Sequence, residues 1–436
     1  MAQTRRSLLA APVAGALTGG LAGGRAAGAD AAGPTEPPSA GALLERYVAL
    51  GGKASGGPGD LACGEWMAQW LTARGFSVER QAFDAPFFEA TETSFQIGEA
   101  RAPVIPQAIV RPTGPDGIEG PVLVRDPEDA ASPATDAIVV IRLPYGRWST
   151  AAAPAVFGPV EAALKAGARA VVLITSGPSG EALALNADGR APMFAAPVAV
   201  LAPKDAPALI KAARSGARGV LRITGQAGRR ETFNLIGRKD GGRGRWLVVS
   251  TPRSGWFGCA GERGPGVAAW MMLADWASRA NLPVDLAFVC NSGHEYENLG
   301  AEHLLDKAAP PPDQTRFWLH LGANLAARDW HELGGRLAPL PSADPQRFLL
   351  ASPDLIAPCR AAFKGLAGLE APYPLGAGAA GELTHIAAAG YTRVAGVFGA
   401  HRFHHAAGDD ARCVDASLVD AAFQAARRLL SDPRIL

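Results

Sequence analysis

The sequence predicts an α/β fold: a mostly parallel sheet with helices on both faces. From residue 232 onward, short apolar segments alternate with segments of helical periodicity. Apolar strands that alternate with helices are typical of parallel sheets covered on both faces. A smaller α/β or β-rich block over residues 101–229 interrupts this pattern. We therefore expect a main domain formed by residues 41–100 and 230–436, with the block inserted as a second domain.

The individual elements follow from periodicity and from Gly and Pro positions. Pro265 is expected to open its helix, because the N–H that proline lacks would have no partner at the first helical position. Gly167 is expected to end a helix in the left-handed conformation. Helices are predicted over residues 43–50, 63–74, 160–166, 205–215, 265–276 and 416–430, and strands from residue 76 and over 138–141, 170–175, 197–201, 246–250, 284–290, 317–321 and 393–398.

Composition and charge exclude several classes of protein. Of the 436 residues, 48% are hydrophobic, which is too apolar for a disordered chain. A formal net charge of +1 gives no electrostatic basis for a nucleic-acid partner. Beyond the N-terminus no uncharged apolar stretch reaches the roughly 18 residues of a membrane span, so no integral membrane segment is expected in the mature chain. The five cysteines form no C-x-x-C pair, which argues against a thiolate zinc site.

The first 29 residues have the pattern of a signal peptide. Arg5 and Arg6 form a twin-arginine pair, an apolar stretch follows over residues 10–22, and Ala27-Gly28-Ala29 is a small-x-small cleavage site. Residues 30–40 contain several prolines and predict a linker. We expect export to the periplasm or the medium; the alternative is a disordered tail rich in Ala and Gly.

Imidazoles and carboxylates follow the predicted strands of the main domain. All eight histidines lie at or after residue 294. His294 and Glu295 follow one strand, His320 ends another, His405 follows a third, and Glu262 closes the loop after a fourth. Ligands of such sheets bind beyond the carboxyl ends of the strands, and these side chains are of the type that zinc takes. A single histidine at a strand end is more often a hydrogen-bonded surface group; the convergence favours zinc.

Several of these segments resemble the aminopeptidase-type zinc exopeptidases, a family that includes glutaminyl cyclases and glutamate carboxypeptidase. Residues 51–83 are similar to the segment that leads into their catalytic domain, and residues 101–229 to the protease-associated domain often inserted there. Residues 287–304 are similar to their strand with a Glu-Glu pair and a Gly-Leu-x-Gly turn. The segment His405-Ala-Ala-Gly-Asp409 resembles their His-Thr-x-x-Asp ligand segment.

The departures from the family pattern decide what the resemblance implies. The His-x-Asp slot of dinuclear members holds Thr251-Pro252-Arg253, and the bridging Asp-Asn slot holds Glu262-Arg263. The Glu-Glu pair is His294-Glu295, and the later ligand Asp is His320.

The resemblance therefore implies one complete metal set, Glu262, Glu295 and His405, with His320 beside it. We expect at most one tightly bound zinc ion. Arg253, if it turns inward, would repel a second cation; the alternative is that it points to solvent.

The remaining polar residues receive roles from the same resemblance. His294 stands at the general-base position, and with a reference pKa of about 6.5 it can accept a proton near neutral pH or donate to an oxyanion. Arg263, Glu382 and Asp409 are candidates for substrate binding, the two acids for a free amine. The alternative for both acids is a solvated surface carboxylate.

Two functions are compatible with the sequence. The first is an exported, zinc-dependent, aminopeptidase-like hydrolase of peptides or other small amides, with the inserted domain restricting access. The second is a catalytically inactive pseudo-peptidase that binds or scaffolds a partner. A serine hydrolase is excluded because no G-x-S-x-G elbow is present. The sequence leaves the exact substrate and the oligomeric state open.

Overall fold

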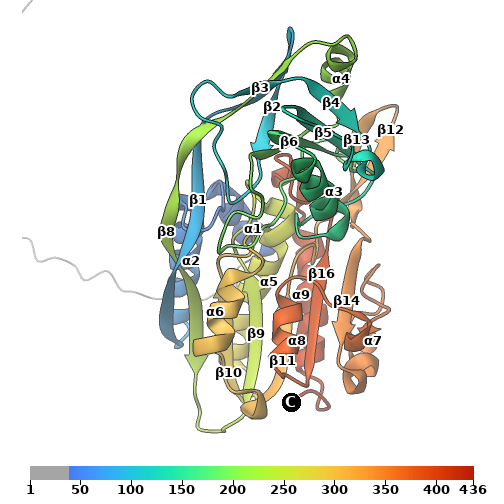
Figure 1. Ribbon diagram of the computed structural model, residues 1–436. Coiled ribbons are helices and arrows are strands. Elements are labelled where there is room, and N and C mark those ends of the chain that lie inside the picture. Colours follow the sequence, from blue (N-terminus) through green and yellow to red (C-terminus); the bar gives the residue numbers. More distant parts are fainter. Residues whose placement is uncertain (1–38) are drawn as a thin grey trace, which may run out of the picture. The chain divides into compact units, whose positions relative to one another are not determined.

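The computed structural model describes residues 39–436, so the predicted signal peptide and most of the predicted linker lie outside the described residues. Figure 1 shows the arrangement of the elements. Among the described helices, none is both long enough and apolar enough to cross a membrane.

Four parallel strands form the centre of the main sheet. They are β9 (Trp246–Pro252), β10 (Asp285–Asn291), β11 (Thr315–Leu321) and β16 (Val394–Gly399), in the order β16-β11-β9-β10. Antiparallel neighbours flank them: β8 (Gly219–Lys239) pairs with β10, and β14 (Arg347–Ala351) pairs with β16 and with the short β15 (Tyr373–Pro374). The mostly parallel α/β prediction is confirmed.

Helices cover both faces of this sheet because the strands are apolar on both. Val248 and Val249 are adjacent and fully buried, and they belong to different core clusters on opposite faces. One face carries α1 (Ala40–Ala49), α2 (Pro58–Thr72), α5 (Ala260–Arg279), α7 (Ile356–Ala362) and α9 (Ala416–Leu430). The other carries α6 (Leu299–Lys307) and α8 (Glu382–Ala388).

Two long strands connect the main sheet with a second group of strands (Figure 1). β1 (Ser77–Ile97) and β8 pair antiparallel over almost their whole length. The chain between them, residues 98–218, is called the intervening segment here. It holds β2 (Ala100–Pro106), β3 (Ile118–Gly120), β4 (Val122–Arg125), β5 (Ile138–Leu143), α3 (Pro154–Lys165), β6 (Ala170–Thr175), β7 (Val198–Leu201) and α4 (Ala206–Arg214). The predicted borders at 101 and 229 fall inside β2 and β8, and the division into domains stays a prediction.

A two-stranded hairpin lies outside the large sheet. It consists of β12 (Arg328–Leu333) and β13 (Arg336–Ala343), which pair antiparallel. Trp330 from this hairpin packs with Leu183 of the intervening segment and with Phe403 in the loop after β16. The hairpin thus joins the intervening segment to the loop that carries the last histidines.

Helix α5 begins five residues earlier than predicted, at Ala260, so Pro265 lies inside it. The Asp409 carboxylate explains the early start, because it accepts from the backbone N–H groups of Gly261 at 2.6 Å and Glu262 at 3.1 Å. Such side-chain acceptors cap N–H groups that have no partner within a helix. The correction matters for the site, since it places Glu262 and Arg263 in the first turn of a buried helix.

Candidate functional site

The polar residues gather at the carboxyl edge of the four parallel strands. The register aligns Asn291 at the end of β10 with Pro252 at the end of β9, and His320 on β11 with Ser250. The first turn of α5 and the loop after β16 meet above this edge. The predicted location of the site is therefore the place where the imidazoles and carboxylates converge.

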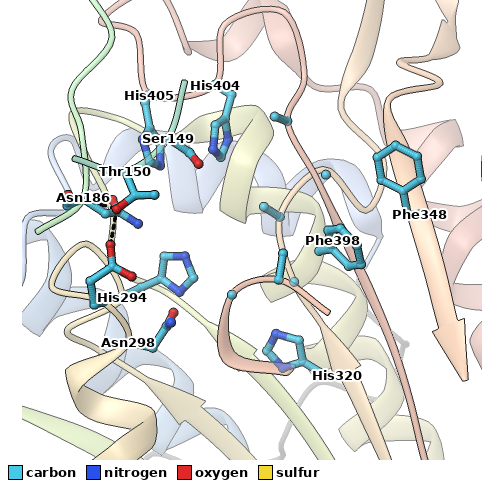
Figure 2. A pocket seen from close by; sticks show the side chains of 17 residues that line it. Ser149, Thr150, Asn186, His294, Asn298, His320, Phe348, Phe398, His404 and His405 are labelled. Carbon is cyan, nitrogen blue, oxygen red and sulfur yellow. Dashed lines mark hydrogen bonds between the residues drawn. The ribbon is translucent and has the colours of Figure 1, made fainter. Parts of the chain in front are cut away.

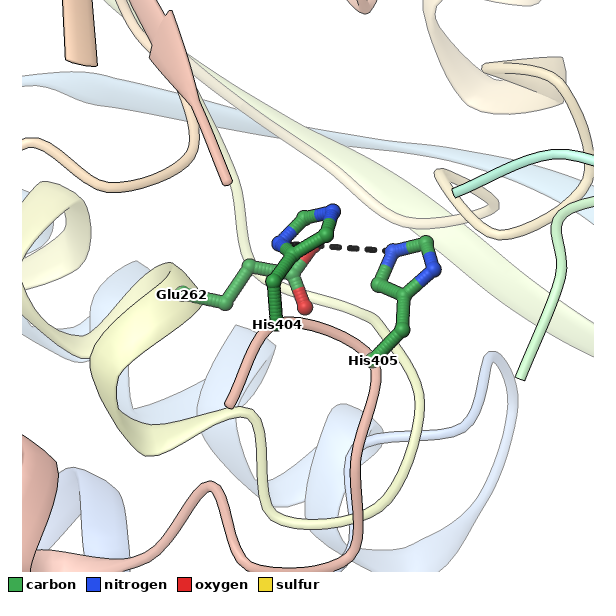
Figure 3. A group of neighbouring side chains, drawn as sticks. All are labelled: Glu262, His404 and His405. Carbon is green, nitrogen blue, oxygen red and sulfur yellow. Dashed lines mark ion pairs between the residues drawn. The ribbon is translucent and has the colours of Figure 1, made fainter. Parts of the chain in front are cut away.

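Glu262, His404 and His405 form a buried cluster, which Figure 3 shows. One potential ligand atom of each lies within 4.8 Å of the others. Glu262 Oε1 is 3.3 Å from His405 Nε2 and 3.8 Å from His404 Nδ1. The two imidazole rings stack with centroids 4.0 Å apart. Of these two histidines, the sequence predicts His405 alone as a ligand; in the structure both rings face Glu262.

A backbone carbonyl fixes the orientation of His405. Its Nδ1 lies 2.8 Å from the Ala184 carbonyl oxygen, which can only accept, so Nδ1 carries the proton. Nε2 is then left to face the Glu262 carboxylate. Histidines that bind metals commonly donate their second nitrogen in this way.

The ion pair of Arg263 and Glu262 shares this cluster. Nη2 of Arg263 lies 2.6 Å from Glu262 Oε1, and Nε of Arg263 donates to the Ser254 carbonyl at 3.1 Å. Burial alone would raise the pKa of Glu262, but the Arg263 guanidinium outweighs it, with His404 and His405, and holds that pKa well below its usual range. Glu262 is therefore ionised at neutral pH.

A second group surrounds Glu382 at the start of α8. Glu382 Oε2 accepts from Asn291 Nδ2 at 2.8 Å, while Oε1 lies 3.6 Å from His294 Nδ1. His320 Nδ1 is 4.0 Å from Oε2 and 2.9 Å from the Ser250 hydroxyl. Burial lowers the pKa of His294, and lowers that of His320 to about 4, so both rings are neutral at neutral pH. Glu382 is fully buried and holds these two rings in place.

Glu295 lies apart from both groups, although the sequence predicts it as a metal ligand. Its carboxylate accepts from the Ser55 N–H at 2.6 Å and from the Ser254 hydroxyl at 2.9 Å. Burial raises the pKa of Glu295, against the hydrogen bonds from Ser55. The structure thus brings Glu262 together with His405 and His404. Glu295 is instead hydrogen-bonded to Ser55, in the loop that precedes α2.

Arg253 turns inward, which is one of the two orientations predicted for it. It pairs with the carboxylate of Asp60 and not with a residue of the Glu262 cluster. Its Nε lies 2.9 Å from Asp60 Oδ1, both side chains are fully buried, and its Nη2 donates to the Phe233 carbonyl at 2.7 Å. Thr251 donates to the Leu321 carbonyl at 2.8 Å. Residues 251–253, which the sequence analysis compared with a His-x-Asp ligand segment, are therefore engaged in an internal ion pair and a backbone hydrogen bond.

Asp409 caps α5, and its carboxylate also lies 3.2 Å from His401 Nε2. It is 2% exposed. The structure places this predicted substrate-binding residue beneath the site, where it positions the turn that bears Glu262.

A cavity of about 310 Å³ opens over the two groups, as Figure 2 shows. Four imidazoles line it, and the carboxylates of Glu262 and Glu382 stand behind them. The intervening segment, which the sequence analysis expected to restrict access, supplies part of the wall through Ser149, Thr150 and Asn186, none of which the sequence analysis named. The lining side chains are Ser149, Thr150, Asn186, His294, Glu297, Asn298, His320, Phe348, Phe398, His404 and His405, with small residues between them.

The chemistry of the Glu262 cluster fits one zinc ion. Oε2 of Glu262 and Nδ1 of His404 are buried without a hydrogen-bond partner in the described structure, whereas Oε1 of Glu262 is paired with Arg263. A carboxylate and two imidazoles are a donor set that zinc takes, and facing acceptors need a cation or a proton between them. Oε2 makes no hydrogen bond to the described residues, so it is available to a cation. Glu262, His404 and His405 could therefore bind a metal.

No family model and no curated protein matches the sequence. Solved structures do match. The zinc aminopeptidase BSAP from Bacillus subtilis has a TM-score of 0.69 at 15% identity, covering 90% of this chain and 95% of that one. The chain has the fold of the zinc aminopeptidases.

Two further structures agree with this result. An aminopeptidase from Aneurinibacillus sp. strain AM-1 has a TM-score of 0.63 at 16% identity, over 90% of this chain and 93% of that one. A peptidase M28 precursor from Shewanella amazonensis SB2B has a TM-score of 0.68 at 14% identity, over 90% and 95%. At such identities the likeness shows the fold, and the chemistry must be argued from this chain's own residues.

Proposed function

We propose that the protein is an aminopeptidase-like hydrolase of peptide or other small amide bonds, with one zinc ion held by Glu262, His404 and His405. The observation that carries the proposal is a pair of buried acceptors without hydrogen-bond partners among the described residues, Oε2 of Glu262 and Nδ1 of His404, at the edge of a histidine-lined cavity. The fold, which is that of zinc aminopeptidases, supports it. A zinc ion bound there would supply Lewis-acid polarisation of the amide carbonyl.

The protein's own residues supply the proton transfers. Burial keeps His294 neutral, and its Nδ1 faces Glu382, so Nε2 is the free basic nitrogen. His294 takes a proton from the attacking water and delivers it to the leaving amine. Glu382 stabilises the transient imidazolium, because its carboxylate lies 3.6 Å from the ring. The cavity's limited volume selects small substrates.

A specific observation favours a second candidate, a metal-free binding protein that has lost the chemistry. Arg263 neutralises Glu262 at 2.6 Å, and Glu295 is engaged by Ser55 and Ser254. In this alternative the guanidinium takes over the electrostatic role of the cation. The two candidates differ in a measurable quantity, the zinc content.

The test is metal analysis of the full chain purified without chelator. We expect about one zinc per chain, as for a site with three protein ligands. Glu262→Gln, His404→Ala and His405→Ala should lose it, whereas His331→Ala, on the exposed hairpin, should keep it. Absence of zinc after loading would establish the binding protein. Loss of zinc in Glu295→Gln but not in His404→Ala would support the ligand set predicted from the sequence, which has Glu295 in place of His404.

Activity is tested on the same samples. Aminoacyl amides, dipeptides and N-acyl amino acids are compared as substrates for wild type and His294→Gln. The variant should retain zinc and lose about 10²–10⁴-fold in rate, the usual contribution of general acid–base catalysis. A rate that does not change in this variant would remove His294 from the mechanism.

We further propose that the chain is exported, on the basis of the twin-arginine pattern. Cell fractionation compares wild type with a variant in which Arg5 and Arg6 are both Lys. Export predicts wild-type protein in the periplasm or medium and cytoplasmic retention of the variant.

A further inference from the structure

Two successive residues with left-handed backbones stand in the cavity wall. Glu297 has φ of 48° and Asn298 has φ of 67°, and neither is glycine. Non-glycine residues adopt this region at an energetic cost, and such residues cluster at ligand sites. Both belong to the lining of the cavity, directly before α6. The two unfavourable backbone conformations therefore occur at the point where two polar side chains line the cavity.

These side chains offer acceptors that lack donors. Asn298 is 6% exposed, and its Oδ1 is buried without a partner. Glu297 accepts from the Thr150 hydroxyl through Oε1, which leaves its second oxygen without a bond to the described residues. Figure 2 shows Asn298 and Thr150 on the same side of the cavity, with the bond from Thr150 drawn. A buried acceptor without a donor is costly, so this wall is suited to a ligand with several N–H groups.

The charge of the lining residues also favours a cationic ligand. Glu297 is the only acidic residue among the described lining residues, and no lysine or arginine is among them. A cation that enters the cavity therefore meets one uncompensated negative charge at this wall.

The opposite wall is aromatic. Phe348 and Phe398 lie with ring centroids 5.5 Å apart, and Figure 2 shows them across the cavity from Asn298. The apolar surface continues past these two rings into a groove of about 330 Å³ with Leu350 and Tyr373. A ligand that spans the cavity is therefore cationic at one end and apolar at the other.

We propose that Glu297 and Asn298, with Thr150 of the intervening segment, form a subsite for a primary ammonium group whose carbon chain lies on Phe348 and Phe398. The subsite is separate from the Glu262 cluster and combines Thr150 of the intervening segment with two residues that precede α6. It rests on the proposed function only in that the ammonium compound is taken to be part of the substrate.

The test is calorimetric titration of the full-length protein with 2-phenylethylamine and with its neutral analogue 2-phenylethanol. Chelator is present in one series, so that the amine cannot bind through a metal. We expect the amine to bind about tenfold or more tightly than the alcohol, as charge-assisted hydrogen bonds predict. Glu297→Gln should remove this preference and leave the alcohol's affinity unchanged. Glu302→Gln, a matched substitution in α6 outside the cavity lining, should retain it.

The wild-type comparison needs no variant, so the test stands even if Glu297→Gln fails to fold. Equal binding of the two compounds, no binding of the amine, or a preference that persists in Glu297→Gln would each overturn the subsite. Zinc analysis of the same samples separates the two proposals. A chain that holds no zinc but prefers the amine loses the proposed hydrolytic function and keeps the subsite.

Discussion

Nη2 of Arg263 lies 2.6 Å from Oε1 of Glu262, with the two side chains 1% and 0% exposed. This pair places a permanent positive charge next to the only carboxylate of the candidate metal cluster. A guanidinium at that distance repels every cation that approaches Glu262, so the cluster can accept at most one ion. It also makes the folding of the metal-free chain depend on Arg263.

Arg263→Ala should destabilise the chelated protein by about 3–5 kcal/mol, because it leaves a buried carboxylate without its partner. Added zinc should restore more stability to this variant than to wild type, since a cation at Glu262 replaces the missing charge. Thermal unfolding with and without zinc measures both effects. Arg279→Ala, on the same helix but largely exposed, is the control. Equal effects of zinc on wild type and Arg263→Ala would contradict the idea that Glu262 binds it.

Arg253→Met should lower the free energy of unfolding by about 3–5 kcal/mol, because Asp60 then stays buried and unpaired. The double variant with Asp60→Asn should recover part of this loss. Urea denaturation of the four proteins gives the coupling energy. The exposed pair of Arg80 and Glu65 serves as a control, with an expected effect of Arg80→Met below about 1 kcal/mol. Zinc content should not change in Arg253→Met, since Arg253 contacts Asp60.

His320 should make the stability depend on pH between about 4 and 6.5. Its folded pKa of about 4 lies below the unfolded value, so the unfolded chain binds the proton more tightly in this window. The free energy of unfolding therefore falls as pH falls from 6.5 towards 4, by about 3 kcal/mol for this group. His320→Asn should flatten the profile in denaturant titrations of chelated protein, whereas His331→Asn should not. A profile as steep in His320→Asn as in wild type would show that other groups cause it.

Asp409→Ala should cost about 1–2 kcal/mol, the usual effect of removing a helix N-cap. It should also weaken zinc binding, because the turn that it caps bears Glu262. Denaturation and zinc titration are compared with those of Asp410→Ala, whose carboxylate pairs locally with Arg412. An unchanged zinc affinity in Asp409→Ala would mean that this turn is held by its other contacts.

The sequence predicted the fold and the location of the site for the same physical reason. Parallel buried strands are recognisable as short apolar runs, and their carboxyl ends necessarily share an edge. His294, His320 and His405 were found because each follows such a run. The predicted helix over 416–430 is confirmed residue for residue as α9.

The side-chain partners could not be predicted, because distant backbone contacts decide them. His404 and His405 face the same carboxylate because His405 has a left-handed backbone, with φ of 60°. An extended segment would have turned them to opposite sides. The engagement of Glu295 by the Ser55 N–H, and the contribution of Thr150 to the cavity, depend on tertiary packing that leaves no local pattern in the sequence.

Several hydrogen bonds join the loop that carries the last histidines to the intervening segment, and three of them lie at His405 and Gly408. Ala184 accepts from His405 Nδ1 and donates to the His405 carbonyl at 2.9 Å, and Glu181 accepts from the Gly408 N–H at 2.9 Å. A shortened chain in which a tight turn joins β1 directly to β8 would thus retain every candidate metal ligand. It would nevertheless lack the Ala184 carbonyl, which selects the tautomer of His405. The intervening segment therefore orients one of the candidate metal ligands, and its removal would change the candidate centre itself.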